Sequence, residues 1–166
     1  MTYPNRDEHA AQRRELRDLL ANLVSGAVDR DGVEMYLSTG AVLGVPIPGS
    51  LLVTAEPEDV EHPVRLPVDM LVDGLRDKYG KRAEVFSVEL PSGPAVRCRR
   101  QEHTDDARAL GQPADRPSTL LEYYVPVPNS AAWLLLTFST PIPELADVQV
   151  EMFDAIATTL RWSYPE

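Results

Sequence analysis

The order of hydrophobic and polar residues along the chain predicts helical segments that alternate with extended ones. In residues 7–25 the apolar residues recur at helical spacing, so they share one face. These residues are Leu16, Leu19, Leu20, Leu23 and Val24. Charged residues such as Arg13 and Asp18 fill the other positions, and Gly26 supplies a stop. The pattern predicts an amphipathic helix whose stripe fits either the chain's own sheet or a second subunit.

Strands and a short helix are predicted next. From Gly32 to Glu56, apolar and polar residues alternate as in strands. A kink or turn is expected at residues 46–49, because Pro46 and Pro48 lack a backbone donor. The acidic, proline-bounded residues 56–65 predict an exposed loop. A helix is expected over residues 67–79, which begin with proline and carry a helical apolar stripe.

A first hairpin follows this helix. Residues 84–90 and 95–103 are strand-like, and the segment between them contains two prolines and a glycine, which is typical of a turn. Residues 104–117 are polar and contain glycine and prolines, so they predict a mobile loop.

A second hairpin and a closing helix complete the chain. Residues 119–127 and 131–140 are long apolar strands, and the run from Trp133 to Leu136 is apolar on both faces, as in a central strand. Residues 143–160 predict a helix. Its expected apolar face comprises Leu145, Val148, Met152, Ile156 and Leu160, broadened by Phe153 and Ala157.

Together these elements predict an α+β fold, with a twisted antiparallel β-sheet sandwiched between helices. Residues 1–166 are expected to form a single domain, in which the helix at about 7–25 precedes a sheet-and-helix core at about 32–162. A chain of this length buries roughly 70% of its unfolded surface, so it needs neither a metal nor a disulfide to fold.

Three phrases of the sequence carry a family resemblance. They are Pro46-Ile47-Pro48-Gly49-Ser50-Leu51-Leu52-Val53, Leu136-Thr137-Phe138-Ser139-Thr140-Pro141, and Phe153-Asp154-Ala155-Ile156-Ala157-Thr158-Thr159-Leu160-Arg161-Trp162. With the order of elements, they resemble the PsbP-like fold and its uncharacterised bacterial cytoplasmic branch. Known relatives include a photosystem II assembly factor, a nuclear-import factor and bacterial lipoproteins. The resemblance implies a binding protein more than an enzyme.

Charge and composition narrow the range of partners. The net charge of -10 at pH 7 opposes attraction to nucleic acids and to anionic lipids. The polar first segment and the absence of a run of ~20 apolar residues predict neither a signal peptide nor a membrane span. A cytoplasmic bacterial protein is expected. The single cysteine, Cys98, has a strand position that favours a packed thiol over a reactive one.

One basic cluster, Arg97 to Arg100, stands out in this acidic chain. Strand alternation places Arg97 and Arg99 on one face and Cys98 and Arg100 on the other. The pair is expected either to bind cross-strand carboxylates such as Glu89 or Glu122, or to form a site for an anion or an acidic peptide.

Two adjacent tyrosines, Tyr123 and Tyr124, add a candidate contact, because one of two neighbouring strand residues faces each side of the sheet. The candidate contact residues are therefore Arg97, Arg99, Tyr123 and Tyr124.

The sequence contains no catalytic motif, metal-ligand spacing or phosphate loop, so no cofactor is expected. The leading hypothesis is a noncatalytic binding or adaptor protein that acts through a protein partner. The alternative is a small-molecule binding protein for an anionic ligand, or an enzyme of unrecognised type, with a pocket near the Arg97 to Arg100 strand. A homodimer through Leu16, Leu19, Leu20 and Leu23 is a third hypothesis.

Overall fold

The computed structural model describes residues 10–29, 31–38, 41–42, 45–56, 64–103 and 116–163. Its elements are, in order, α1 (Ala10–Val28), β1 (Gly32–Leu37), β2 (Ala41–Val42), β3 (Val45–Pro46), β4 (Ser50–Glu56), α2 (Val68–Tyr79), the 3-10 helix η1 (Gly80–Arg82), β5 (Ala83–Leu90), β6 (Gly93–Glu102), β7 (Ser118–Pro126), β8 (Trp133–Thr140), the 3-10 helix η2 (Pro143–Leu145) and α4 (Ala146–Ala157). Most of the two predicted loops, residues 57–63 and 104–115, lies outside the described residues, as do residues 7–9 of the first predicted helix.

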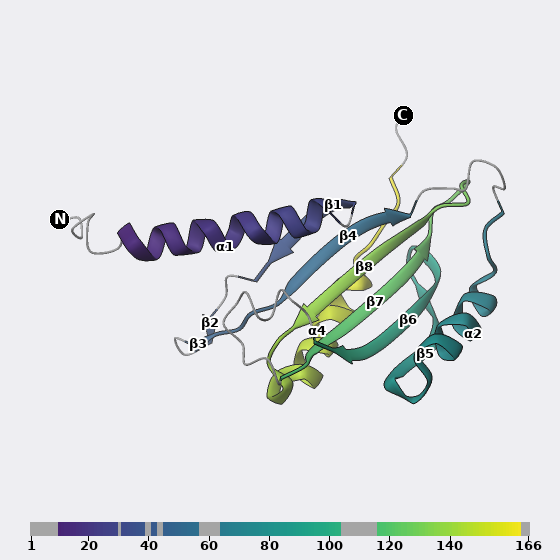
Figure 1. Ribbon diagram of the computed structural model, residues 1–166. Helices are drawn as coiled ribbons and strands as arrows, with labels where there is room; N and C mark the ends of the chain where they lie inside the picture. The colour runs from purple at the N-terminus through teal and green to yellow at the C-terminus, as the bar shows by residue number, and fades with distance from the viewer. Residues whose placement is uncertain are drawn as a thin grey trace.

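Six strands form one antiparallel sheet in the order β1-β4-β8-β7-β6-β5 (Figure 1). Both predicted hairpins are present, as β5–β6 and β7–β8. Strand β8 lies between β4 and β7, which confirms the central position predicted from its apolar run. The fold is therefore α+β with an antiparallel sheet, as the sequence predicts.

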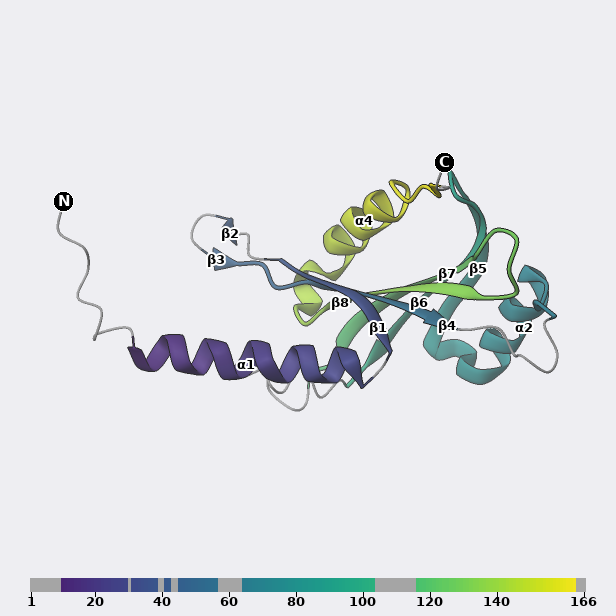
Figure 2. The same ribbon diagram turned by 90° about the horizontal axis from the view of Figure 1, so that it is seen from above.

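Helices cover both faces of this sheet. Figure 2 shows α4 on one side, and α1 and α2 on the other. Under α4, the sheet contributes an apolar layer centred on Phe138, which is fully buried and stacks on Phe153 with ring centroids 4.9 Å apart. Tyr123 meets the ring of Phe138 edge-on at 6.4 Å. Such close aromatic packing makes this layer the main core of the protein.

On the opposite face, α2 covers only the end of the sheet that is formed by β5 and β6. Val72 and Leu75 of α2 pack against Val85, Val96 and Cys98 there. Helix α1 packs against the other end, along the edge strand β1, and buries Leu23 and Ala27. Its first half extends beyond the sheet (Figure 1). Within the described residues, no helix has the length and apolarity that crossing a membrane requires.

Helix α1 continues past Gly26, so the predicted stop at that residue is wrong. Burial of Ala27, which is 6% exposed, favours another turn of helix and offsets the cost of about 1 kcal/mol for an interior glycine. The helix ends when Asp31, at a φ of 54°, donates its backbone N–H to the carbonyl of Val28.

Two other predictions are corrected. Pro46 pairs with Ala41 in the small ladder of β2 and β3, although a kink or turn was expected over residues 46–49, of which only 47–49 lie outside the strands. The closing helix is shorter than residues 143–160, and its buried face matches the predicted one only at Phe153 and Ala157. Val148, Met152 and Ile156 are 68%, 44% and 41% exposed. The buried residues are Ala146, Gln149, Val150, Phe153 and Ala157. Periodicity identified the helix but did not fix its rotation, because apolar residues occupy both faces.

Two glycines give a test of how closely α1 approaches the sheet. A Cβ atom on Gly32 would lie 2.7 Å from the carbonyl oxygen of Ala27 and 2.9 Å from a methyl carbon of Leu52. We expect Gly32→Ala to lower the free energy of unfolding by about 1–3 kcal/mol, as overpacking does. Gly74 is exposed inside α2 with no atom within 4 Å of such a Cβ. Gly74→Ala should raise stability by about 0.5–1 kcal/mol. Urea unfolding measures both, and equal effects would contradict the close approach of Ala27 of α1 and Leu52 of β4 to Gly32.

Candidate functional site

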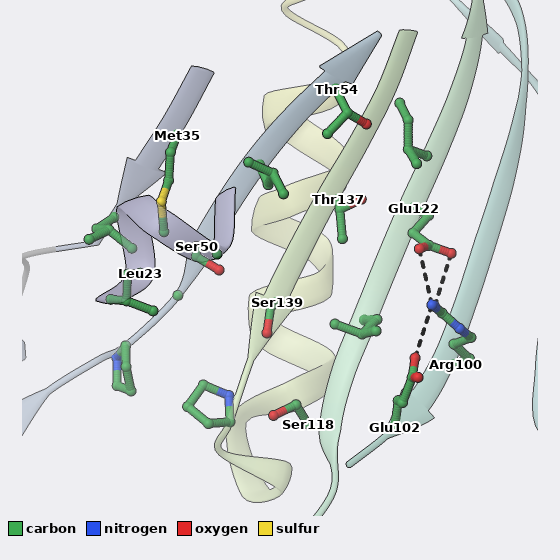
Figure 3. A pocket seen from close by; sticks show the side chains of 18 of the residues that line it. Leu23, Met35, Ser50, Thr54, Arg100, Glu102, Ser118, Glu122, Thr137 and Ser139 are labelled. Atoms are coloured by element: carbon green, nitrogen blue, oxygen red, sulfur yellow. Dashed lines mark hydrogen bonds and ion pairs between the residues drawn. The ribbon is translucent and has the colours of Figure 1, made fainter. Parts of the chain in front are cut away.

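Beyond the area that α2 covers, the same sheet face forms a cleft with a volume of about 890 Å³ (Figure 3). Three neighbouring strands build most of its floor with alternate residues. These include Leu52 and Thr54 of β4, Leu135 and Thr137 of β8, and Leu120 and Glu122 of β7. Leu23 of α1 and Met35 of β1 form the wall on one side. The cleft is therefore built by the sheet itself, with α1 as one border.

The composition of this floor differs from that of the opposite face. Leu52, Thr137 and Glu122 lie side by side in a cross-strand row. The adjacent row along the strands has side chains that point to the opposite face, under α4. It holds Leu51, Phe138 and Leu121, which are all apolar. Because successive residues of a strand face opposite sides, β7 and β8 supply an apolar surface to the core and a mixed surface to the cleft.

A charged cluster lies in the floor at the border with β6. Arg100 forms two hydrogen bonds with the carboxylate of Glu122, at 2.9 and 3.1 Å, and a third contact of 3.0 Å with Glu102 (Figure 3). The side chains of Arg100 and Glu122 are only 12% and 7% exposed. Burial raises the pKa of Glu122 above its ordinary value, although Arg100 acts in the opposite direction. The ring of Tyr79 lies 5.0 Å from the Arg100 guanidinium and adds a cation–π contact.

The predicted pair Arg97 and Arg99 points to the other face, under α4, while Arg100 faces the cleft. This arrangement confirms the predicted alternation, but the carboxylates that bind the pair were not predicted. Arg97 makes a two-pronged contact of 2.8 and 3.0 Å with Asp154 of α4, and Arg99 contacts Asp147 at 2.5 Å. Neither arginine pairs with the cross-strand Glu89 or Glu122 that the sequence suggested.

The two candidate tyrosines also lie on different faces. Tyr123 is 3% exposed and donates its hydroxyl to Asp154, beside Arg97. Burial and the carboxylate of Asp154 raise its pKa. Tyr124 is partly buried against the apolar group under α2, and burial is the main cause of its raised pKa. The four predicted contact residues are therefore divided between two faces and do not form one site.

The cleft itself was not predicted from the sequence. A usable signal existed, because Glu122 and Thr137 are polar positions that follow apolar runs in the two strands of the second predicted hairpin. Of the leucine stripe on α1, Leu23 is buried against the chain's own sheet at 5% exposure, whereas Leu20 is 40% exposed. The side chains of Leu16 and Leu19 lie outside the described set.

Two features of the described residues bear on their chemistry, namely metal ligation and the thiol of Cys98. Within them, no group of three or more His, Cys, Asp or Glu side chains could hold a metal ion. Cys98 is buried under α2, and burial raises the pKa of its thiol to about 11. Such a thiol is a packing group and a poor nucleophile at neutral pH.

Comparisons with known proteins support the fold alone. No family model and no curated protein matches the chain. Among solved structures, the fold is similar to that of a protein of unknown function from Pseudomonas aeruginosa, for which a regulatory role has been suggested. The two share 13% identity with a TM-score of 0.51, over 80% of this chain and 83% of the other.

The two arginine–aspartate pairs under α4 differ in burial, which gives a matched test. Arg97 is 10% exposed and Asp154 is 37% exposed, whereas Asp147 is 85% exposed. Asp154→Ala leaves a buried guanidinium and the Tyr123 hydroxyl without their acceptor, so it should cost about 2 kcal/mol, less than a fully buried pair. Asp147→Ala should cost less than about 1 kcal/mol. Comparable losses in urea unfolding would show that α4 is not anchored at Asp154.

The thiol gives a second test. At pH 8 a pKa of about 11 leaves on the order of 0.1% of Cys98 as thiolate. Alkylation of the native protein by iodoacetamide should therefore be at least about 100-fold slower than alkylation of the urea-unfolded chain. The two alkylation rates are measured by mass spectrometry. Equal rates for the native and the unfolded chain would contradict the burial of this side chain.

Proposed function

We propose that the protein is a noncatalytic binding or adaptor protein, which holds a segment of a protein partner in the sheet cleft. The observation that supports this proposal is the contrast between the two faces of β7 and β8. One face is closed by α4 over an apolar layer, whereas the other leaves leucines, hydroxyl groups and a buried ion pair along an open floor. A mixed floor of this kind suits a ligand with both apolar and polar groups.

The length of the cleft favours a polypeptide over a small molecule. Glu56 lies opposite Trp133 of β8, whereas Glu102 lies opposite Ser118 of β7, about eight residues further along. The two ends are thus roughly 26 Å apart along the strands and three strand spacings, about 14 Å, apart across them. An elongated surface of this size matches a short extended segment or several turns of helix.

The alternative of an anionic small molecule near Arg97 to Arg100 has less support. Arg97 and Arg99 are bound to Asp154 and Asp147, and Arg100 is bound to Glu122 and Glu102. An anionic ligand would have to displace carboxylates from each of these guanidinium groups. At Arg100 it would leave the buried carboxylate of Glu122 unpaired, at a cost of several kcal/mol.

Site-specific photo-crosslinking tests the proposal. A photoreactive phenylalanine analogue in place of Thr137 lies in the floor of the cleft, and the same analogue in place of the exposed Glu151 of α4 serves as the control. In cells of the native host, we expect one discrete protein adduct from position 137 and none from position 151. Ser139→Trp, which fills the cleft, should abolish the adduct, whereas Val148→Trp on the outer face of α4 should not.

Two results would contradict the proposal. Identical adducts from both positions would mean that the contacts are nonspecific. The second result is that position 137 yields no protein adduct, while a metabolite stabilises the protein by about 2.7 kcal/mol at 100 times its dissociation constant. If the protein also consumes that metabolite, it is an enzyme.

A further inference from the structure

The charges around the cleft are distributed unevenly. Asp31 and Glu56 lie at the end nearest the start of β1, and both side chains are exposed. Glu102 lies at the opposite end, on β6, with its side chain 52% exposed. Arg100 is the only arginine or lysine among the described residues that line the cleft. Within the described lining, the carboxylates of Asp31, Glu56, Glu102 and Glu122 outnumber the single guanidinium of Arg100 by three.

The charges in the floor at the border with β6 already pair with one another. Glu122 accepts two hydrogen bonds from Arg100, and Glu102 contacts the same guanidinium. This group of three keeps one excess negative charge, at the Glu102 end. Among the described residues no ion pair neutralises Asp31 or Glu56. The remaining negative charge thus lies at the two ends of the cleft, with leucines and hydroxyl groups between them.

We propose that the partner segment held in the cleft, whose existence rests on the function proposed above, is amphipathic and basic. Its apolar side chains contact the floor around Leu52 and Leu120, and its lysines or arginines face the acidic ends at Glu56 and Glu102. An acidic segment would meet like charges at both ends, so the carboxylates at the ends of the cleft also disfavour binding of acidic partners. Association with a basic segment should also slow as salt rises, because the end groups are exposed and act over a Debye length of about 8–10 Å.

Synthetic peptides of defined charge test this inference. Three labelled peptides of about 18 residues span roughly 27 Å as helices, which matches the cleft. They share one pattern of leucines at helical spacing and carry lysine, glutamine or glutamate at the polar positions. In fluorescence anisotropy with the full chain at low salt, we expect the lysine peptide to bind at least about tenfold more tightly than the glutamate peptide.

Two double variants locate the effect. Glu56→Gln with Glu102→Gln removes one negative charge from each end of the cleft. The control, Glu89→Gln with Glu151→Gln, removes the same net charge from the exposed edge strand β5 and from α4. The first should weaken binding of the lysine peptide about three- to tenfold and leave the glutamine peptide unchanged, whereas the control should change either by less than about twofold.

The outcomes separate this inference from the proposed function. Equal binding of all three peptides, or equal effects of the two double variants, overturns the basic partner but leaves a protein segment in the cleft. A crosslink from position 137 to α1 of a second copy overturns it in favour of self-association. If no peptide binds and position 137 yields no adduct, the proposed function fails together with the inference.

Discussion

The alternation of side chains along β7 and β8 is the constraint on which the rest of this structure depends. Each of these strands has to satisfy two environments at once, because neighbouring residues face opposite sides of the sheet. Leu121 and Phe138 enter the layer under α4, and the adjacent Glu122 and Thr137 enter the cleft. A shift of register by one residue would bury Glu122 in an aromatic core and expose Phe138. The core therefore fixes the position of every group in the cleft floor.

The same constraint explains what the sequence could predict. The strands and hairpins follow from apolar residues that repeat every two positions, and the helices from apolar residues that repeat every 3.6 positions. The central place of β8 follows from its apolar run. The structure confirms these elements. The faces of Arg97 and Arg99 also follow, because alternation is a local property. Their partners do not, because Asp154 and Asp147 lie more than 45 residues away on a helix whose rotation is set by tertiary packing. The sequence of α4 permits two apolar faces, and only docking of Phe153 on Phe138 selects one of them.

The cleft could not be predicted for a related reason. It forms beyond the part of the sheet that α2 covers, mainly β5 and β6, and the extent of this coverage is set by tertiary packing. A local signal was present in Glu122 and Thr137, but a polar residue within a strand equally indicates an ordinary solvent-facing side. The structure distinguishes the two cases, because Glu122 is 6% exposed and is held by Arg100. A buried ion pair in a sheet face is a costly feature to maintain for stability alone.

The position of β1 at the edge of the sheet gives the two borders of the cleft different mechanical properties. Strand β1 pairs with β4 on one side only, and its ladder is interrupted between Gly32 and Glu34. Helix α1 packs against it, and among the side chains of α1 that the structure describes only Leu23 and Ala27 are buried, while the floor is paired on both sides and supported by α4. Local opening is least costly where buried contacts are few. The border formed by α1 and β1 therefore opens at a lower free-energy cost than the floor, so the width of the cleft changes more readily than the spacing of the floor groups.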